Sequence, residues 1–124
     1  MATWSPAELD AIGNAEELHI QSRRTDSTLR NPVIIWVVRV DDRLYVRAVG
    51  GPTSPWFKGT QTRHEGHISA GGIDRDVTFT AVDPSLHTAI DHVYRTKYAN
   101  QPAEYVDPCV TPQAQQATLE LIPG

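Results

Sequence analysis

Residues 31–56 read NPVIIWVVRVDDRLYVRAVGGPTSPW, and this stretch decides the fold. Its first part, Val33–Val40, is rich in β-branched residues, which favour a strand over a helix. Asp41-Asp42-Arg43 indicates a turn, and Leu44–Val49 is the predicted return strand. A hairpin this apolar must be covered on both faces, so we expect it at the centre of a sheet or barrel.

The segment after this hairpin predicts a binding surface for a small molecule. Gly50 and Gly51 permit positive φ and close approach of the backbone, and Trp56 supplies a flat stacking face. Backbone N–H groups in such a turn can bind an anion, and Lys58 and Arg63 lie just downstream. The alternative interpretation is a plain turn beside a core tryptophan.

Two further residues belong to this predicted ligand shelf. Arg47 lies shortly before the glycines and can bind a phosphate through two hydrogen bonds. Trp36, in the first strand, offers a second flat face for an aromatic ring system. Whether Trp36 and Trp56 face a groove or the core stays open, because a one-residue change of register moves a side chain to the other face of a strand.

The chain before and after the hairpin predicts short strands and one helix at the N-terminus. A capping box formed by Ser5 and Glu8 begins that helix, and residues 16–22 alternate as a half-exposed strand. Residues 56–63 fit either a short helix or an irregular segment. A turn at Gly71-Gly72 leads into a strand over 76–82. That strand places on one face Val77, Phe79 and Ala81.

The C-terminal third predicts a helix, a long connection and a last strand. Asp83-Pro84 is typical of a helix start. The helix has a buried face at helical spacing, formed by Leu86, Ile90, Val93 or Tyr94, and Lys97 or Tyr98. On its exposed face, Asp91 and Arg95 are spaced to pair. Residues 100–112 carry three prolines and predict a loop with a single helical turn, long enough to act as a lid. The last strand is expected over 117–122.

The pattern of elements and the composition favour one small domain over residues 1–124. About six hairpin-linked strands with two or three short helices predict an antiparallel barrel with helices on its flank, an α+β fold. The net charge of −4 argues against general binding of nucleic acid, which requires a basic face. Small basic clusters, Arg23-Arg24 with Arg30 and Lys58 with Arg63, suit one phosphate or carboxylate, or a solvated surface.

The cysteine content and the hydropathy of the sequence indicate the cellular compartment of the protein. Cys109 is the single cysteine, so an intrachain disulfide is excluded and a reducing environment fits. No apolar run follows a basic start, so no signal peptide is indicated. No stretch approaches the roughly 20 apolar residues that cross a bilayer. We therefore expect a cytoplasmic protein without a membrane partner.

Three other sets of residues are weaker candidates for chemistry. His64 and His67 lie three positions apart, but on a strand such residues point to opposite faces, so we predict no metal site. His87 with Asp91, or His92, could act in acid–base chemistry or form a solvated helix face. Cys109 is better interpreted as a buried small residue than as a nucleophile.

Several of these motifs resemble a family of small bacterial proteins known as domain-of-unknown-function family 2255. The similarity runs from Trp4 to Pro123, and its most distinctive part is Ile90-Asp91-x-x-Tyr94-x-x-Lys97-Tyr98. Other matching positions are Trp36-Val37-Val38, Leu44-Tyr45-Val46-Arg47, Gly50, Trp56, Gly66 and Asp76-Val77. Membership implies a fold and supplies no activity.

More distantly, the order of elements is similar to the split β-barrels of flavin reductases, pyridoxamine-phosphate-oxidase-like proteins and deazaflavin-dependent nitroreductases. In the nitroreductases the matching region lines a cofactor groove, and here it corresponds to Arg30 with Pro32, Leu44-Tyr45-Val46, Gly50-Gly51 and Pro55-Trp56. This resemblance implies a split β-barrel, an FMN- or deazaflavin-binding groove, and dimers whose grooves lie between subunits.

Three functional hypotheses follow. In the first, an oxidoreductase binds FMN or a deazaflavin beside Gly50, Gly51 and Trp56, anionic groups are bound by Arg47, Lys58 and Arg63, and Tyr45 or Tyr94 donates a hydrogen bond to the substrate. In the second, the groove belongs to a cofactor-free isomerase, cyclase or hydrolase of a biosynthetic pathway. In the third, the protein is a non-catalytic binding module or homodimer.

Overall fold

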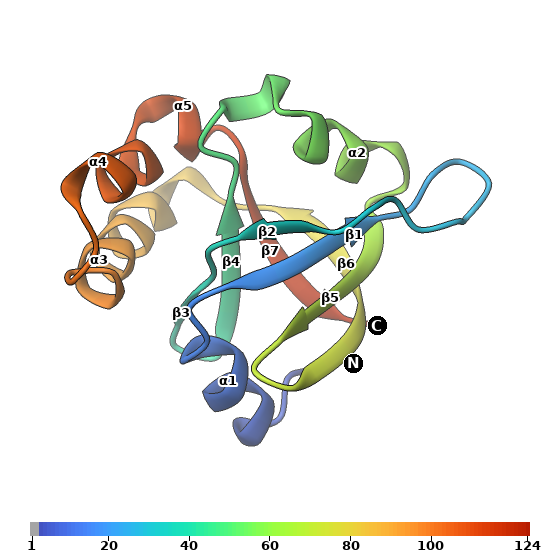
Figure 1. Cartoon of the computed structure of the whole chain (residues 1–124), viewed down its shortest axis with the longest axis horizontal. Helices are drawn as coiled ribbons and strands as arrows, with labels where there is room; N and C mark the ends of the chain where they lie inside the picture. Colours follow the sequence, from blue (N-terminus) through green and yellow to red (C-terminus); the bar gives the residue numbers. More distant parts are fainter. Residues whose placement is uncertain (1–2) are drawn as a thin grey trace.

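The computed structural model describes residues 3–124, which form one curled antiparallel sheet with flanking helices (Figure 1). The strands are β1 (Leu18–Ser22), β2 (Val33–Ile35), β3 (Val38–Val40), β4 (Arg43–Arg47), β5 (Glu65–Ala70), β6 (Ile73–Ala81) and β7 (Thr118–Pro123). Their order across the sheet is β2-β1-β5-β6-β7-β4-β3. The predicted split-barrel α+β fold is confirmed.

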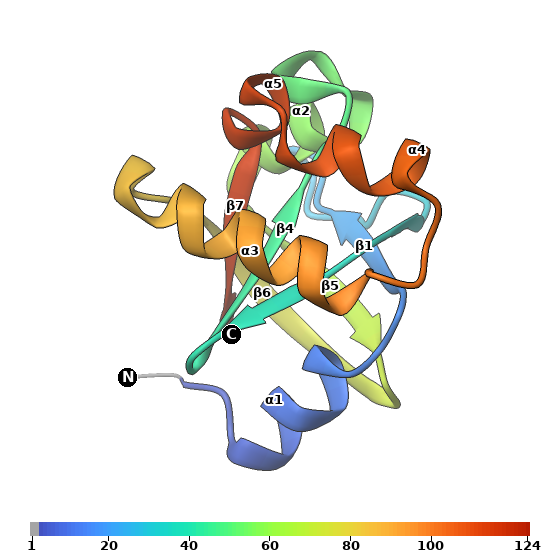
Figure 2. The ribbon, with the colours of Figure 1, turned by 90° about the vertical axis from the view of Figure 1, so that its left-hand side faces the viewer.

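The helices cover the two ends and one outer side of this barrel. They are α1 (Pro6–Gly13), α2 (Pro55–Arg63), α3 (His87–Lys97), α4 (Ala103–Val106) and α5 (Pro112–Gln115), with three 3-10 turns, η1 (Gly51–Thr53), η2 (Pro84–Leu86) and η3 (Asp107–Val110). Figure 1 shows α1 and α2 at opposite ends of the barrel, and Figure 2 shows α3 lying across the outer side of the sheet. Within residues 3–124, no helix has both the length and the hydropathy to cross a membrane.

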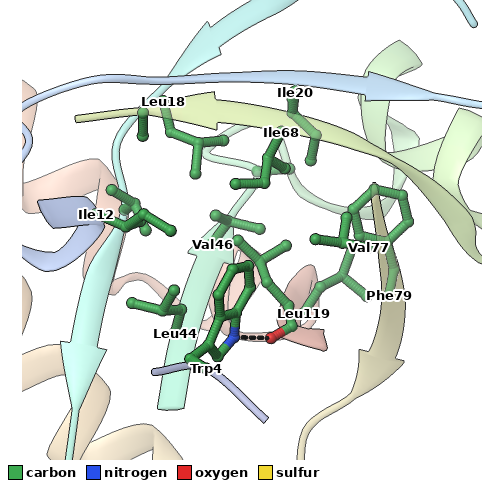
Figure 3. Close-up of a cluster of buried hydrophobic side chains, with 14 of the residues drawn as sticks. Trp4, Ile12, Leu18, Ile20, Leu44, Val46, Ile68, Val77, Phe79 and Leu119 are labelled. Carbon is green, nitrogen blue, oxygen red and sulfur yellow. Dashed lines mark hydrogen bonds between the residues drawn. The ribbon is translucent and has the colours of Figure 1, made fainter. Parts of the chain in front are cut away.

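The barrel interior is the main core. Inward-facing side chains from β1, β4, β5, β6 and β7 meet there (Figure 3). Trp4 closes one end, where its indole N–H donates to the Leu121 carbonyl at 2.9 Å. Leu44 and Val46 of β4 point into this core, as the period of two along a strand requires.

A second core lies outside the sheet, beneath α3 and the connection that follows it. Tyr45, the β4 residue between Leu44 and Val46, packs there with Ile90 and Tyr94 of α3. β4 is therefore buried on both faces, as predicted for the return strand.

The predicted strand over Val33–Val40 is wrong in its length and position. It is two strands, because β2 pairs with β1 whereas β3 pairs with β4. Between them, at Trp36 and Val37, the chain crosses from one edge of the sheet to the other. The barrel therefore has seven strands rather than about six, and the hairpin of β3 and β4 lies at one end of the strand order rather than at its centre.

Most other local predictions are confirmed. Ser5 and Glu8 form the capping box, Asp41 takes a positive φ of 54° in the hairpin turn, and Gly71-Gly72 joins β5 to β6. Residues 56–63 are helical, which is one of the two alternatives. Asp83 accepts the Ser85 N–H before η2, so the predicted helix start is a 3-10 turn that continues into α3.

Three details differ from the predictions. Ala81 is exposed, because its side of β6 borders an open hollow. Asp91 and Arg95 do not pair: Asp91 contacts Arg47, and Arg95 contacts Asp107. The connection over 100–112 contains α4, η3 and the start of α5 rather than a single helical turn.

Candidate functional site

The crossing at Trp36 and Val37 leaves an opening in the barrel wall, which we call the seam hollow. β3 pairs with β4 only from Arg43 to Tyr45. In the part of the chain that the structure describes, the last residues of β4 therefore have no strand on that side, and a gap separates them from β2. The hollow between them has a volume of about 290 Å³. Its lining residues are Ile34, Ile35, Trp36, Arg47, Val49, Trp56, Tyr94, Tyr105 and Cys109.

A second hollow lies on the other side of Trp56, and we call it the arginine hollow. It has a volume of about 280 Å³. It is lined by Ile20, Ser22, Arg24, Arg30, Asn31, Val33, Pro55 and Trp56. Trp56 is shared by the two hollows, so an indole separates a mainly apolar space from a space with two cationic side chains.

Arg30 is the most unusual residue of the arginine hollow. Its Nε atom is buried and has no hydrogen-bond partner among residues 3–124. No carboxylate lines the hollow. Burying a guanidinium N–H without an acceptor is costly. Arg30 is therefore a candidate residue for binding an anionic group.

Gly59 on α2 has no side chain, and this leaves room for the side chain of Arg30. A Cβ at Gly59 would lie 2.4 Å from the Ser22 hydroxyl oxygen and 3.0 Å from Arg30 Nε. Any other residue at this position would push the guanidinium away from the helix. Arg24 lies nearby and is fixed by hydrogen bonds to the Thr28 hydroxyl and the Leu29 carbonyl, at 3.2 and 3.0 Å.

Arg47 occupies the inner wall of the seam hollow and has many partners there. Its side chain is fully buried and pairs with Asp91. Its guanidinium also donates to the Thr118 hydroxyl and the Cys109 carbonyl, both at 2.9 Å, and lies over the Tyr94 ring. Arg47 thus connects β4, β7, α3 and η3.

The motif on α3 fixes the crossing that forms the seam. The Tyr98 ring stacks on Trp36 with centroids 3.9 Å apart, and its hydroxyl accepts the Val37 N–H at 3.2 Å. Lys97 Nζ donates to the carbonyls of Val37 and Ala15. The residues that identify the motif therefore hold one wall of the seam hollow in place.

Burial determines the ionisation of the groups near Arg47. It raises the pKa of the Cys109 thiol to about 11, so this cysteine is protonated near neutral pH. Burial also raises the pKa of Tyr94 well above its ordinary value. Desolvation and the Arg47 charge lower the pKa of His87.

Three of the predicted site residues line the seam hollow: Arg47, Trp56 and Tyr94. The other predicted tyrosine, Tyr45, lies under α3 in the second core and lines neither hollow. The sequence alone could not place these residues, because the face of each strand depends on register.

The glycine turn is covered by other parts of the protein. Gly51 has a φ of +80°, and a Cβ there would lie 2.4 Å from Gln113 Cγ. Its N–H already donates to the Ala48 carbonyl, and Gly50 is exposed beside it. The turn therefore brings the chain past α5, and neither glycine lines the seam hollow or the arginine hollow.

The remaining predicted cations lie outside both hollows. Lys58 is exposed on α2. Arg63 donates to the Glu65 carboxylate and to the Thr25 carbonyl.

The two histidines that were weighed as metal ligands lie in different places. His67 lies between Asp74 and Asp76, each 2.9 Å away, whereas His64 ends α2 with a positive φ.

Arg24 and Arg30 line the arginine hollow, whereas Lys58 and Arg63, which the sequence suggested for anion binding, line neither hollow. The clustering of basic residues before β2 was the available signal, but a solvated loop has the same pattern. The exposed apolar residues Val49 and Tyr105 were also missed, because an isolated apolar residue in a sequence is usually interpreted as core.

Solved structures with the same fold include several cofactor-binding proteins. An F420 reductase aligns with a TM-score of 0.60 and 11% identity, over 93% of this chain and 90% of that one. A putative 5-nitroimidazole antibiotic resistance protein from Bacteroides thetaiotaomicron gives 0.56 and 12%, over 99% and 81%. A FAD-binding protein from Mesorhizobium loti gives 0.54 and 13%, over 97% and 89%. At these identities the likeness establishes the fold.

The comparison with curated proteins found no match. The profile of a bacterial family described as "Uncharacterized protein conserved in bacteria (DUF2255)" matches residues 8–121, which is most of the chain and includes the seam, both hollows and the α3 motif. This protein is therefore a member of the DUF2255 family.

Proposed function

We propose that this protein binds a flavin or deazaflavin across Trp56 and works as a cofactor-dependent reductase. The planar ring lies in the seam hollow and a phosphate of the tail lies in the arginine hollow. The observation that carries this proposal is the buried, unpartnered Nε of Arg30, a residue that lines the same hollow as Trp56, whose other side borders an apolar space.

The two hollows match the two parts of such a cofactor. Trp36, Trp56 and Tyr105 offer aromatic surface in the seam hollow, which suits a planar ring. Two arginines and no carboxylate line the arginine hollow, which suits a phosphate. The F420 reductase and the FAD-binding protein that share the fold are named after cofactors, and each of those cofactors has a planar ring and a phosphate-bearing tail.

A bound flavin or deazaflavin would supply the hydride chemistry. The residues of the protein itself bind and orient the cofactor. Arg30 and Arg24 neutralise the anionic tail, while Val49 and Tyr105 exclude water from the ring. Of the two tyrosines predicted to donate to a substrate, Tyr94 is the one that lines the seam hollow.

Titration with FMN, FAD and a deazaflavin, followed by absorbance and fluorescence, tests the proposal. We expect one of them to bind and its fluorescence to be quenched by Trp56. The variant R30A should weaken binding at least about tenfold, because a charge-assisted hydrogen bond contributes about 1.5–3 kcal/mol. The matched control K58A removes an exposed cation outside both hollows and should bind as the wild type. If none of the three cofactors changes signal, the proposal fails.

We further propose that a second copy of the chain covers the seam. Among residues 3–124, the four exposed large hydrophobic residues each line one of the two hollows; they are Val33, Ile34, Val49 and Tyr105. Such a concentration of exposed apolar surface is typical of an interface. Light scattering after size-exclusion chromatography should show a dimer that I34E converts to a monomer. A monomeric wild-type protein at micromolar concentration contradicts this part of the proposal.

A further inference from the structure

A third hollow lies between α2, α3 and α5, away from the seam. Its volume is about 500 Å³. Figure 1 shows α2 and α5 at the same end of the barrel. The apolar part of the lining is Phe57, Ala81, Val82, Pro84 and Leu119, and the polar part is Gln61, His64, His87, Gln115, Gln116 and Thr118. We call it the glutamine hollow.

The glutamine hollow differs from the arginine hollow in charge. Within the described part of the chain, no lysine, arginine, aspartate or glutamate lines it, although such residues make up 21% of the sequence. Its polar groups are three amides, two imidazoles and a hydroxyl. An ionic ligand would find no opposite charge there, so the lining favours an uncharged molecule.

His87 has a fixed tautomer at the wall of this hollow. Its Nδ1 lies 3.3 Å from an Arg47 Nη atom. An arginine only donates hydrogen bonds, so Nδ1 accepts and the proton of the neutral ring is on Nε2. Arg47 is fully buried and is held by Asp91 and Thr118. His87 is thereby oriented as a hydrogen-bond donor.

The glutamines supply acceptors. The Gln115 side-chain amide donates to the Asp91 carboxylate at 2.9 Å, and the Gln61 amide donates to the Thr60 hydroxyl at 3.0 Å. Both contacts use the NH₂ group, so each amide oxygen keeps its acceptor capacity. Phe57 supplies an aromatic ring to the same lining.

We propose that the glutamine hollow is a second binding site, for an uncharged ring that carries a carboxamide or lactam edge. The ring packs on Phe57 and Leu119. The carbonyl of the ligand accepts from His87 Nε2–H, and its N–H group donates to a glutamine amide oxygen. This site shares no lining residue with the cofactor groove proposed above, although α2 and α3 contribute residues to both.

Nuclear magnetic resonance titration of the labelled protein with nicotinamide tests this inference. Nicotinate is the matched control ligand, because it has the same ring with a carboxylate in place of the carboxamide. Long-range ¹H–¹⁵N spectra should show His87 as the Nε2–H tautomer, and nicotinamide should shift its imidazole signals. Nicotinate should bind at least about fivefold more weakly, as expected for the loss of one hydrogen-bond pairing.

Variants locate the site. H87F should weaken nicotinamide binding about fivefold or more, whereas H92F makes the same change at an exposed position of α3 outside the hollow and should have no effect. Q61L, at an exposed position of α2, gives a second measurement that does not depend on the Arg47 contacts and should also weaken binding. R30A should leave nicotinamide binding unchanged. Equal binding of nicotinate and nicotinamide, or wild-type affinity in both H87F and Q61L, overturns the inference.

Discussion

β2 and β4 both carry aliphatic side chains and have opposite surroundings. β4 is buried on both faces although it contains two arginines, whereas the wholly aliphatic β2 leaves Ile34 57% exposed. β4 has β3 and β7 as neighbours and α3 over its outer side, whereas β2 pairs with β1 alone. Hydrophobic strands therefore become core only where another element covers them, and an uncovered one is available to a ligand or partner.

The largest effect is expected at the covered strand, from Arg47. R47A should destabilise the fold by about 3–5 kcal/mol, because it leaves the Asp91 charge without its buried partner. Urea unfolding measures the loss. The control R95A removes an exposed arginine of α3 and should change stability by less than about 0.5 kcal/mol. A loss below about 1 kcal/mol would mean that Arg47 is not the connection between β4 and the helices.

Alanine substitutions compare the two strands directly. L44A empties a site in the barrel core and should cost about 2–5 kcal/mol. I34A, on β2, should stay within about 0.5 kcal/mol of the wild type. Thermal and urea unfolding of both variants measure the difference. Similar losses in the two variants would show that β2 is as well covered as β4.

The chain crossing between β2 and β3 is tested through Tyr98. Y98F keeps the ring that stacks on Trp36 but removes the hydroxyl that contacts the Val37 N–H and the Glu16 carbonyl. We expect a loss of about 1–3 kcal/mol, since two buried backbone groups lose their partner. Y105F, at an exposed tyrosine, is the control. Near-ultraviolet circular dichroism reports whether the Trp36 stack persists, and an unchanged stability in Y98F contradicts the assigned role.

The smallest effect is a pH dependence at His67. Asp74 and Asp76 raise the pKa of this histidine above 6.5. Because the folded pKa is the higher one, the stabilisation is complete below the unfolded pKa and is lost as pH rises through the folded value. It should amount to less than about 1 kcal/mol, as for other surface pairs. Melting temperatures of the wild type and H67Q should differ at about pH 5.5 and converge near pH 8.5; a constant difference would contradict this assignment.

Local structure was predictable wherever a sequence pattern is compatible with only one backbone conformation. The capping box at Ser5, the turn at Asp41 and the buried face of α3 follow from such patterns, and all three are confirmed. The break at Trp36 was not predictable, because it depends on contacts with Tyr98, which is 62 positions away in the chain.

The candidate site was predictable in part: Arg47, Trp56 and Tyr94 line the seam hollow, whereas the other predicted site residues line neither hollow. Trp56 borders both hollows, and the anion-binding position that we propose is at Arg30 rather than in the glycine turn. Gly50-Gly51 has the composition of an anion-binding turn, but the packing of Gln113 against Gly51 is a long-range contact. Likewise, nothing local to Arg30 indicates that its Nε is buried and lacks a partner.

The central claim is that Arg30 binds the phosphate of a planar cofactor whose ring lies beyond Trp56. The most direct measurement is the affinity of the cofactor that binds, with and without its phosphate, for the wild type and for R30A. The phosphate should strengthen binding to the wild type at least about tenfold, and this advantage should disappear in R30A. Equal affinity for the two forms in the wild-type protein, or an undiminished phosphate advantage in R30A, would contradict the claim.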